Sequence, residues 1–236
     1  MKKLFFKLLG FVSIGAMFIL SSCEKTPPPG SPESRDFNAT DASTLINTYH
    51  QSSSTIASEI EAAGFQKTLI GSDDDEATYS KVTMNGNQAY TESIVLEWDD
   101  DDREKRVEDI TYMKNGNYAG LVGKDYLKKS IESICSVENA RLDKDDDNCY
   151  ILVGSVLTGD RMTTFSNPSD FYTKAVEAID NNYDTGGEFY ISVEIEAAAD
   201  AEYSLSFERW TGSIGGYDAV TESITIEAED LSRGVW

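Results

Sequence analysis

Three aspartates at alternate positions are the residues of this chain best spaced for metal binding. Asp143, Asp145 and Asp147 lie in one acidic run, and calcium loops use this spacing because alternate side chains converge on one ion through oxygen ligands. The full calcium-loop motif is incomplete, since an asparagine follows Asp147 where a turning glycine belongs, and Gly154 stands where a bidentate glutamate would close the site. The run predicts either a calcium site or a solvated acidic turn, and the sequence indicates no other cofactor.

Residues suited to acid–base or nucleophilic catalysis are sparse. His50 is the single histidine, so it cannot form a multi-histidine metal site, and no motif near it marks a nucleophile. Glutamates alternate with apolar residues in the ranges 188–196 and 202–208, and glycosidases do use paired carboxylates. A catalytic pair needs one carboxyl group with a raised pKa in a cleft, whereas this alternation predicts an open, solvated sheet face. We therefore predict a protein that is not an enzyme and assign no catalytic residue.

The first 23 residues carry a processing and anchoring motif. Three lysines precede an apolar run from Leu8 to Leu20, which ends in Leu20-Ser21-Ser22-Cys23. The apolar run has about 13 residues, fewer than the roughly 20 that span a bilayer. In these features the segment resembles a bacterial lipoprotein signal peptide. The resemblance implies cleavage before Cys23, a lipid on that cysteine, and a protein anchored to a membrane of the cell envelope. Whether the protein faces the periplasm or the cell exterior is left open.

The two remaining cysteines flank the acidic run. Cys135 precedes it and Cys149 follows it. In the oxidising compartment that the signal peptide implies, an even pair of cysteines predicts a disulfide, which would close a loop of about 15 residues and contribute about 3 kcal/mol to stability. The alternative is two buried free thiols.

Composition and charge restrict the class of partner. The net charge is −22 at pH 7, and removal of the three signal-peptide lysines would make it about −25. Such a surface repels phosphate backbones, so we predict that nucleic acid is not a partner. Four of the five prolines lie in the range 27–32, which predicts an extended tether. We expect a signal peptide at 1–22, a lipidated cysteine and tether at 23–39, and one domain at 40–236.

Hydrophobic periodicity assigns the elements that must position these residues. We expect helices at 41–63, 124–134 and 168–182, the last of them capped by Asn167. The expected strands are Ala77–Asn85, Gln88–Trp98, Arg103–Met113, Tyr150–Leu157, Glu188–Glu196, Glu202–Glu208 and Glu222–Ala228.

This order predicts an α+β fold with a mainly antiparallel curved sheet packed on one face by about three helices. For function, we favour a non-enzymatic binding or accessory module whose partner is an unknown protein or small molecule. A carrier of an amphiphilic ligand in an apolar cavity is the first alternative, and a carboxylate-based hydrolase is the weaker one.

Overall fold

The computed structural model describes residues 52–68, 75–99, 103, 105–143, 149–154, 165–197, 201–214 and 217–230. The predicted signal peptide, lipidated cysteine and tether lie outside these ranges, as does His50.

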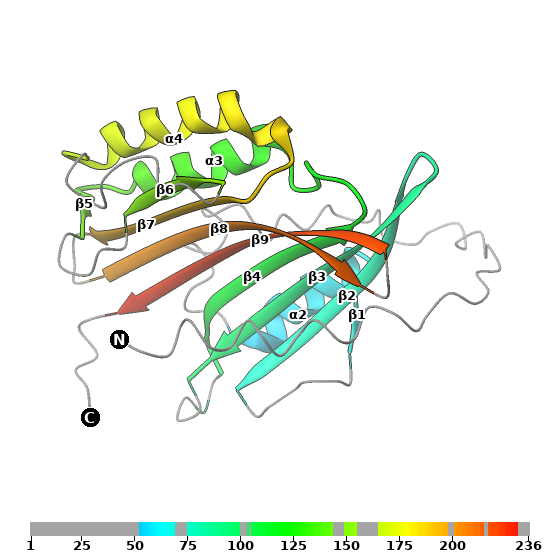
Figure 1. Ribbon diagram of the computed structural model, residues 1–236. Coiled ribbons are helices and arrows are strands. Elements are labelled where there is room, and N and C mark those ends of the chain that lie inside the picture. The colour runs from blue at the N-terminus through cyan, green and yellow to red at the C-terminus, as the bar shows by residue number, and fades with distance from the viewer. Residues whose placement is uncertain are drawn as a thin grey trace.

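The described strands form one nine-stranded sheet in which every pairing is antiparallel (Figure 1). The order across the sheet is β1-β2-β3-β4-β9-β8-β7-β5, and β6 also pairs with β7. The strands are β1 (Gln66–Lys67), β2 (Glu76–Asn85), β3 (Gln88–Trp98), β4 (Val107–Gly116), β5 (Arg141–Leu142), β6 (Tyr150–Val153), β7 (Phe189–Ala197), β8 (Ala201–Ile214) and β9 (Tyr217–Asp230).

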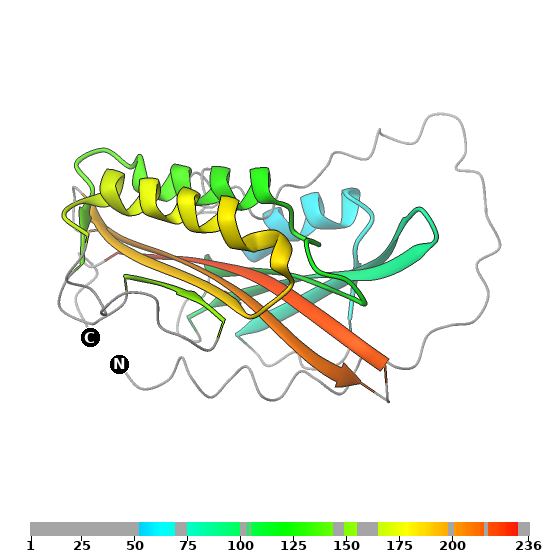
Figure 2. The same cartoon turned by 45° about the horizontal axis from the view of Figure 1, so that its top comes forward.

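Three α-helices of the described residues cover one face of this twisted sheet. They are α2 (Ser53–Ala62), α3 (Lys124–Cys135) and α4 (Pro168–Asn182), and the 3-10 helix η2 (Tyr183–Thr185) extends α4. Figure 2 shows all of them on the same side, with α3 and α4 side by side and α2 over the part of the sheet formed by β2 and β3. The predicted α+β class, with a curved antiparallel sheet and helices on one face, is confirmed.

Alternation along the strands explains why the helices bind this face. In β7 the buried residues are at alternate positions, Phe189, Ile191, Val193 and Ile195, and their neighbours point to the opposite side. Apolar side chains from α2, α3 and α4 join them in one continuous core cluster. The sheet therefore has a helix face, which is buried, and a second face that none of the described helices covers, which we call the open face.

The capping prediction for α4 is confirmed. Asn167 has an extended backbone, its side-chain oxygen accepts a hydrogen bond from the backbone N–H of Asp170 at 3.0 Å, and Pro168 is the first helical residue. An asparagine cap, a proline at the first position and an acidic first turn are features that begin helices.

The predicted first helix is wrong in extent. Ser52 is extended, with φ −66° and ψ 146°, and α2 begins only at Ser53. Apolar spacing alone suggested a continuous helix from Asp41, but Ser52 forms a bridge with Arg106 and the N–H of Ser53 donates to the carbonyl of Lys105 at 2.7 Å. The strand expected from Arg103 also starts later, at Val107, because Lys105 has a left-handed backbone with φ 49° that interrupts an extended chain.

Candidate functional site

A pocket of about 530 Å³ lies between α2 and the adjoining part of the sheet formed by β1, β2 and β3. Its helical wall is a stripe of small residues on α2, and Tyr79 and Trp98 are the aromatic residues in its lining. This volume falls within the roughly 300–1,000 Å³ typical of sites that bind small molecules. The pocket is open to solvent and is a candidate binding site of the described structure.

The lining of the pocket combines aromatic rings with both signs of charge. Lys67 and Lys105 supply the positive charges, and Glu61 and Glu76 supply the negative ones. The Lys105 Nζ lies 5.2 Å from the centroid of the Trp98 ring, a cation–π distance. These groups can bind a polar or doubly charged small molecule.

A second polar feature is a row of alternating charges across five neighbouring strands of the helix face, which we call the charged row. Register places each member opposite the next, so that positive and negative groups alternate. Opposite charges on facing strands stabilise a sheet. In order from β2 to β8, the row consists of Lys81, Glu92, Lys114, Glu222 and Arg209.

Glu92 is the centre of the outer half of the charged row. Its carboxylate lies 3.3 Å from the Lys81 Nζ and 3.7 Å from the Lys114 Nζ, and it accepts hydrogen bonds from the hydroxyls of Thr83 and Tyr112. Burial alone would raise the pKa of Glu92, but these hydrogen bonds and the two lysine charges together lower it. Glu92 is consequently held ionised, which suits a structural ion pair and not a general acid.

Glu222 is the centre of the inner half, and four groups donate hydrogen bonds to its carboxylate. The Arg209 Nε donates at 2.7 Å and the Tyr183 hydroxyl at 3.0 Å, while the backbone N–H groups of Gly120 and Val122 donate at 2.8 and 2.7 Å. Glu222 and Arg209 are both 0% exposed. This carboxylate therefore joins β9, β8, η2 and the connection from β4 to α3 inside the core.

One polar atom of this network has no hydrogen-bond partner among the described residues. It is the Nη2 of Arg209, whose guanidinium also stacks on the Tyr183 ring with 4.3 Å from Cζ to the ring centroid. The guanidinium face on the ring and the Nη1 hydrogen bond to the Tyr183 carbonyl at 2.6 Å hold the side chain in place. The charged row thus has a structural role, because its ion pairs and hydrogen bonds connect the strands beside the apolar core.

Sequence reasoning did not identify the charged row. Glu222 lies two positions before Ile224, and Arg209 lies two positions after Phe207, so strict alternation already places both on the helix face. The signal was present in the strand parity, but the pairing of Arg209 with Glu222 depends on the register of β8 and β9.

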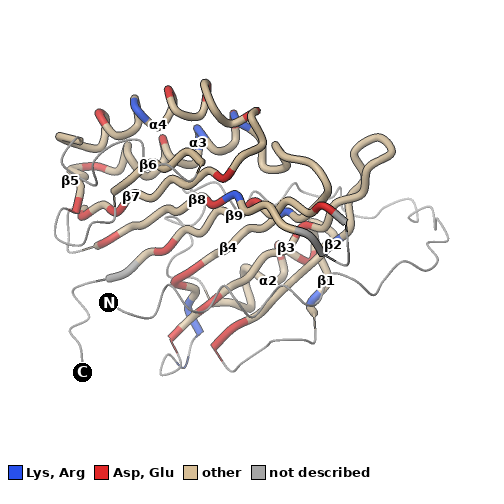
Figure 3. The backbone as a smooth tube through the Cα atoms, viewed as in Figure 1, with Lys and Arg blue, Asp and Glu red and all other residues tan. Residues whose placement is uncertain are grey.

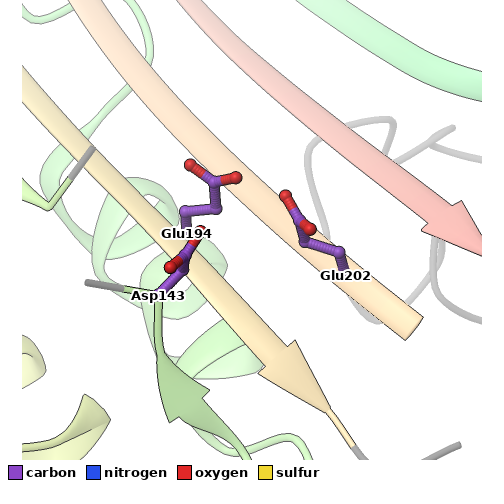
Figure 4. Close-up of side chains that lie close together, drawn as sticks. All are labelled: Asp143, Glu194 and Glu202. Atoms are coloured by element: carbon purple, nitrogen blue, oxygen red, sulfur yellow. The ribbon is translucent and has the colours of Figure 1, made fainter. Parts of the chain in front are cut away.

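Of the three predicted calcium residues, only Asp143 lies among the described residues. Asp143 lies just after β5, and Asp145 and Asp147 lie outside the described residues. Asp143 lies close to Glu194 of β7 and Glu202 of β8, with one carboxylate oxygen from each within 4.8 Å of the others (Figure 4). Figure 3 shows that other acidic positions also lie along the strands of this sheet. Close carboxylates are common on acidic surfaces without a bound ion. We therefore propose no metal site at this cluster.

The predicted disulfide between Cys135 and Cys149 is not formed in the structure, where both are free thiols. The Cys149 thiol is directed to the carbonyls of Asp143 and Glu194, at 3.7 and 3.6 Å. Burial, together with the nearby Cys149, raises the pKa of Cys135 to about 12. Burial likewise raises the pKa of Cys149. The structure therefore contains two free thiols, of which Cys149 is buried and Cys135 is half-buried.

One carboxyl group on the open face has a raised pKa. Burial raises the pKa of Glu208, and its in-register neighbours on β7 and β9 are Tyr190 and Ser223. Neither of these directly opposed neighbours is a carboxylate.

Comparisons with known proteins supply no family for this chain. No protein-family model matches the sequence, and no curated protein matches it. A solved structure of an Escherichia coli K12 protein provisionally named an aldose 1-epimerase has 7% sequence identity and a TM-score of 0.26, over 71% of this chain and 69% of that chain. A likeness at this level carries no argument about fold or activity. Among the described residues, no helix is long and apolar enough to cross a membrane.

Proposed function

We propose that the protein is a lipid-anchored module of the bacterial cell envelope that binds a small polar ligand and catalyses no reaction. The pocket between α2 and the sheet carries the binding part of this proposal. The anchoring part depends on the lipoprotein motif that ends at Cys23. The lipid would keep the domain at a membrane surface, and the proline-rich tether would hold it away from the bilayer.

The chemistry of the pocket favours a ligand with both polar and apolar parts. Its lining has two lysines and two glutamates, so its charges balance although the whole chain carries −22. A zwitterion can pair with both signs, and its apolar part can lie against Tyr79 or Trp98. A zwitterion has no net charge, so the negative field of the whole protein, which would repel a simple anion, does not oppose its binding.

Two observations favour binding over the alternative functions. Phe189 and Phe207 of the sheet pack with Tyr183, with ring centroids 5.9 to 6.4 Å apart, so side chains occupy the layer beneath η2 that a large apolar ligand would need. Glu92 and Glu222 are each surrounded by hydrogen-bond donors and cations, which suits permanent ion pairs. Neither arrangement favours a lipid carrier or a carboxylate hydrolase.

The direct test is native mass spectrometry of the full-length protein purified gently from the cells that make it. We expect a stoichiometric mass excess from a retained small polar molecule. Replacing Ser58, an exposed α2 residue in the pocket wall, by tryptophan should fill the pocket and remove that excess. Glu59→Trp is the matched control, because Glu59 is exposed on the same helix outside the lining.

Each result of this experiment has a defined meaning. Bare protein for both the wild type and Glu59→Trp would contradict ligand binding in this pocket. A retained phospholipid or fatty acid would support the carrier instead. Retention of the mass excess in Ser58→Trp would show that the ligand lies elsewhere.

A further inference from the structure

Among the described strands, none pairs with five residues at the outer edge of the sheet on the β2 side. β1 pairs with β2 only through Gln66 with Ser80 and Lys67 with Tyr79. Among the described residues, no strand pairs with the outer side of β2 from Lys81 to Asn85. We call residues 81–85 the free edge. It is the part of β2 that leads into the hairpin with β3, which projects from the body of the molecule in Figure 1.

The backbone groups of the free edge can accept another strand. The N–H of Thr68 donates to the carbonyl of Thr78 at 2.8 Å, so the carbonyl of Thr78 points away from β3. Backbone direction alternates along an antiparallel strand. The N–H and C=O groups of Val82 and Met84 therefore point outward as well, and those of Thr83 point toward β3.

Apart from Lys81, the side chains of the free edge lack the usual protection. Native edge strands are commonly shielded by charges, prolines or bulges. Here Val82 and Met84 are 68% and 61% exposed, the two highest values among the large hydrophobic side chains described. By alternation both lie on the open face, opposite to Lys81, whose Nζ lies over the Phe65 ring on the helix face.

We infer that the free edge pairs with the free edge of a second copy of this chain, which joins the two sheets across a two-fold axis at Thr83. In this register Val82 faces Met84 of the other copy, and both have outward backbone groups, as an antiparallel hydrogen-bonded pair requires. Thr83 faces its own counterpart in the adjacent non-hydrogen-bonded pair. Lys81 faces Asn85, so the whole free edge of each copy is used and β1 begins directly beyond it.

Charge favours a second copy at this place in particular. A chain of −22 repels another copy over most of its surface. The segment from Lys81 to Thr91, which forms the free edge, the turn and the start of β3, contains no carboxylate. In the two-fold register no like charges face each other, and two apolar pairs are buried. Attachment to one membrane, which is part of the proposed function, would further raise the effective concentration of the two copies.

The two-fold axis gives a direct crosslinking test. In a non-hydrogen-bonded antiparallel pair the Cα atoms are about 4.5 Å apart, within the range that a disulfide can bridge. We expect Thr83→Cys in the full chain to form a covalent homodimer in membranes of the producing cells, seen on a non-reducing gel. Thr211→Cys is the matched control, because Thr211 is an exposed threonine on β8, on the hairpin with β9.

A second substitution then distinguishes strand pairing from random collision. Adding Val82→Pro to Thr83→Cys removes an outward N–H but no hydrogen bond to β3, and edge strands accept proline at such positions. We expect the dimer fraction to fall about tenfold or more, because the loss occurs at both symmetry-related sites. Val82→Lys should also lower the dimer fraction, without introducing a proline. Val82→Thr should leave the dimer fraction unchanged.

The proposal has clear opposing outcomes. It is overturned if Thr83→Cys yields no more dimer than Thr211→Cys, or if Val82→Pro and Val82→Lys both leave the dimer unchanged. A covalent adduct of Thr83→Cys with a different protein, without homodimer, also overturns it. None of these results depends on the pocket or on a bound ligand, so failure here leaves the proposed function to its own test.

Discussion

Glu222 shows how a single buried carboxylate can connect distant parts of the chain. Its partners come from the β4–α3 connection, from η2 and from β8, segments separated from it by up to 102 positions in sequence. A buried ion pair contributes little net stability when compared with an apolar pair of the same shape, but breaking one partner leaves a charge without compensation. The contribution of Glu222 to the free energy of unfolding is therefore best tested by removing its charge alone.

We expect Glu222→Gln to lower the free energy of unfolding by about 3–5 kcal/mol. The amide keeps the shape of the side chain but leaves the Arg209 guanidinium, which is 0% exposed, without its counterion. Urea denaturation followed by circular dichroism measures the change, with Glu177→Gln on the exposed side of α4 as control. A loss below about 1 kcal/mol would mean that water or rearrangement compensates the arginine.

Glu92 and Glu208 should give opposite pH dependences of stability. The pKa of Glu92 is lowered in the folded protein, so its contribution is present above the pKa of the unfolded chain and is lost as pH falls through the folded value. The pKa of Glu208 is raised by burial, so its charged form destabilises the fold as pH rises through the folded value. Glu92→Gln should therefore destabilise the protein at pH 7 and flatten the acid limb, whereas Glu208→Gln should stabilise it at pH 7. Urea midpoints between pH 3 and 8 test this, and equal signs for the two variants would refute it.

The thiols of Cys135 and Cys149 should react slowly with an alkylating reagent in the native protein, and the reaction should need no prior reduction. Cys135 and Cys149 are free in the structure, and burial raises the pKa of each, so little thiolate is present at pH 8. We expect iodoacetamide without reductant to modify both residues completely in urea but only slowly in the native protein. Peptide mass mapping reads out each site. Failure to modify them in urea unless a reductant is added would show a disulfide in the isolated protein.

At the scale of elements, the cap of α4 is a feature that sequence and structure describe in the same way. Replacing Asn167 by alanine removes the acceptor for the Asp170 N–H, so we expect a loss of about 1 kcal/mol in the free energy of unfolding. Ser169→Ala, an exposed change in the same first turn, is the control. A loss no larger than that of the control would indicate that Pro168 alone sets the start of α4.

The elements that sequence predicts well are those whose signals are local. The turn between β2 and β3, the alternation in β7 and the cap of α4 each need only a few neighbouring residues, and all three agree with the structure. The start of α2 was misplaced because it depends on Ser52 and Ser53 meeting Arg106 and Lys105 from a distant part of the chain. Long-range register, which local periodicity does not specify, makes that contact.

The same distinction applies to the candidate site. The aspartates of the acidic run were visible by their spacing, but the carboxylates that Asp143 meets come from β7 and β8. The pocket likewise combines residues 53–61 of α2 with residues of β1, β2 and β3. Sequence reasoning could name charged and aromatic residues, but only the packing of α2 on the sheet brings these together.

At the scale of the whole molecule, the two faces of the sheet carry different charges. Packing on the helix face uses the cations Lys81, Lys114 and Arg209 within the charged row, where each is matched by a carboxylate. On the open face, glutamates of β7 and β8 such as Glu194 and Glu202 contribute to the negative charge of the chain. A surface of this sign is repelled by anionic lipid headgroups. In the function that we propose, membrane attachment is therefore expected to depend on the Cys23 lipid alone.

Replacing Cys23 by alanine tests that dependence. A lipid-free chain with a strongly acidic domain has no electrostatic attraction to an anionic bilayer, so we expect Cys23→Ala to lose partition into the detergent phase of Triton X-114 and to lose metabolic labelling by a radioactive fatty acid. Cys135→Ala should keep both, because that thiol belongs to the folded domain. If Cys23→Ala were processed and retained in the membrane like the wild type, the lipoprotein interpretation would be wrong. The domain would then need a different attachment to place its pocket and its free edge at the membrane.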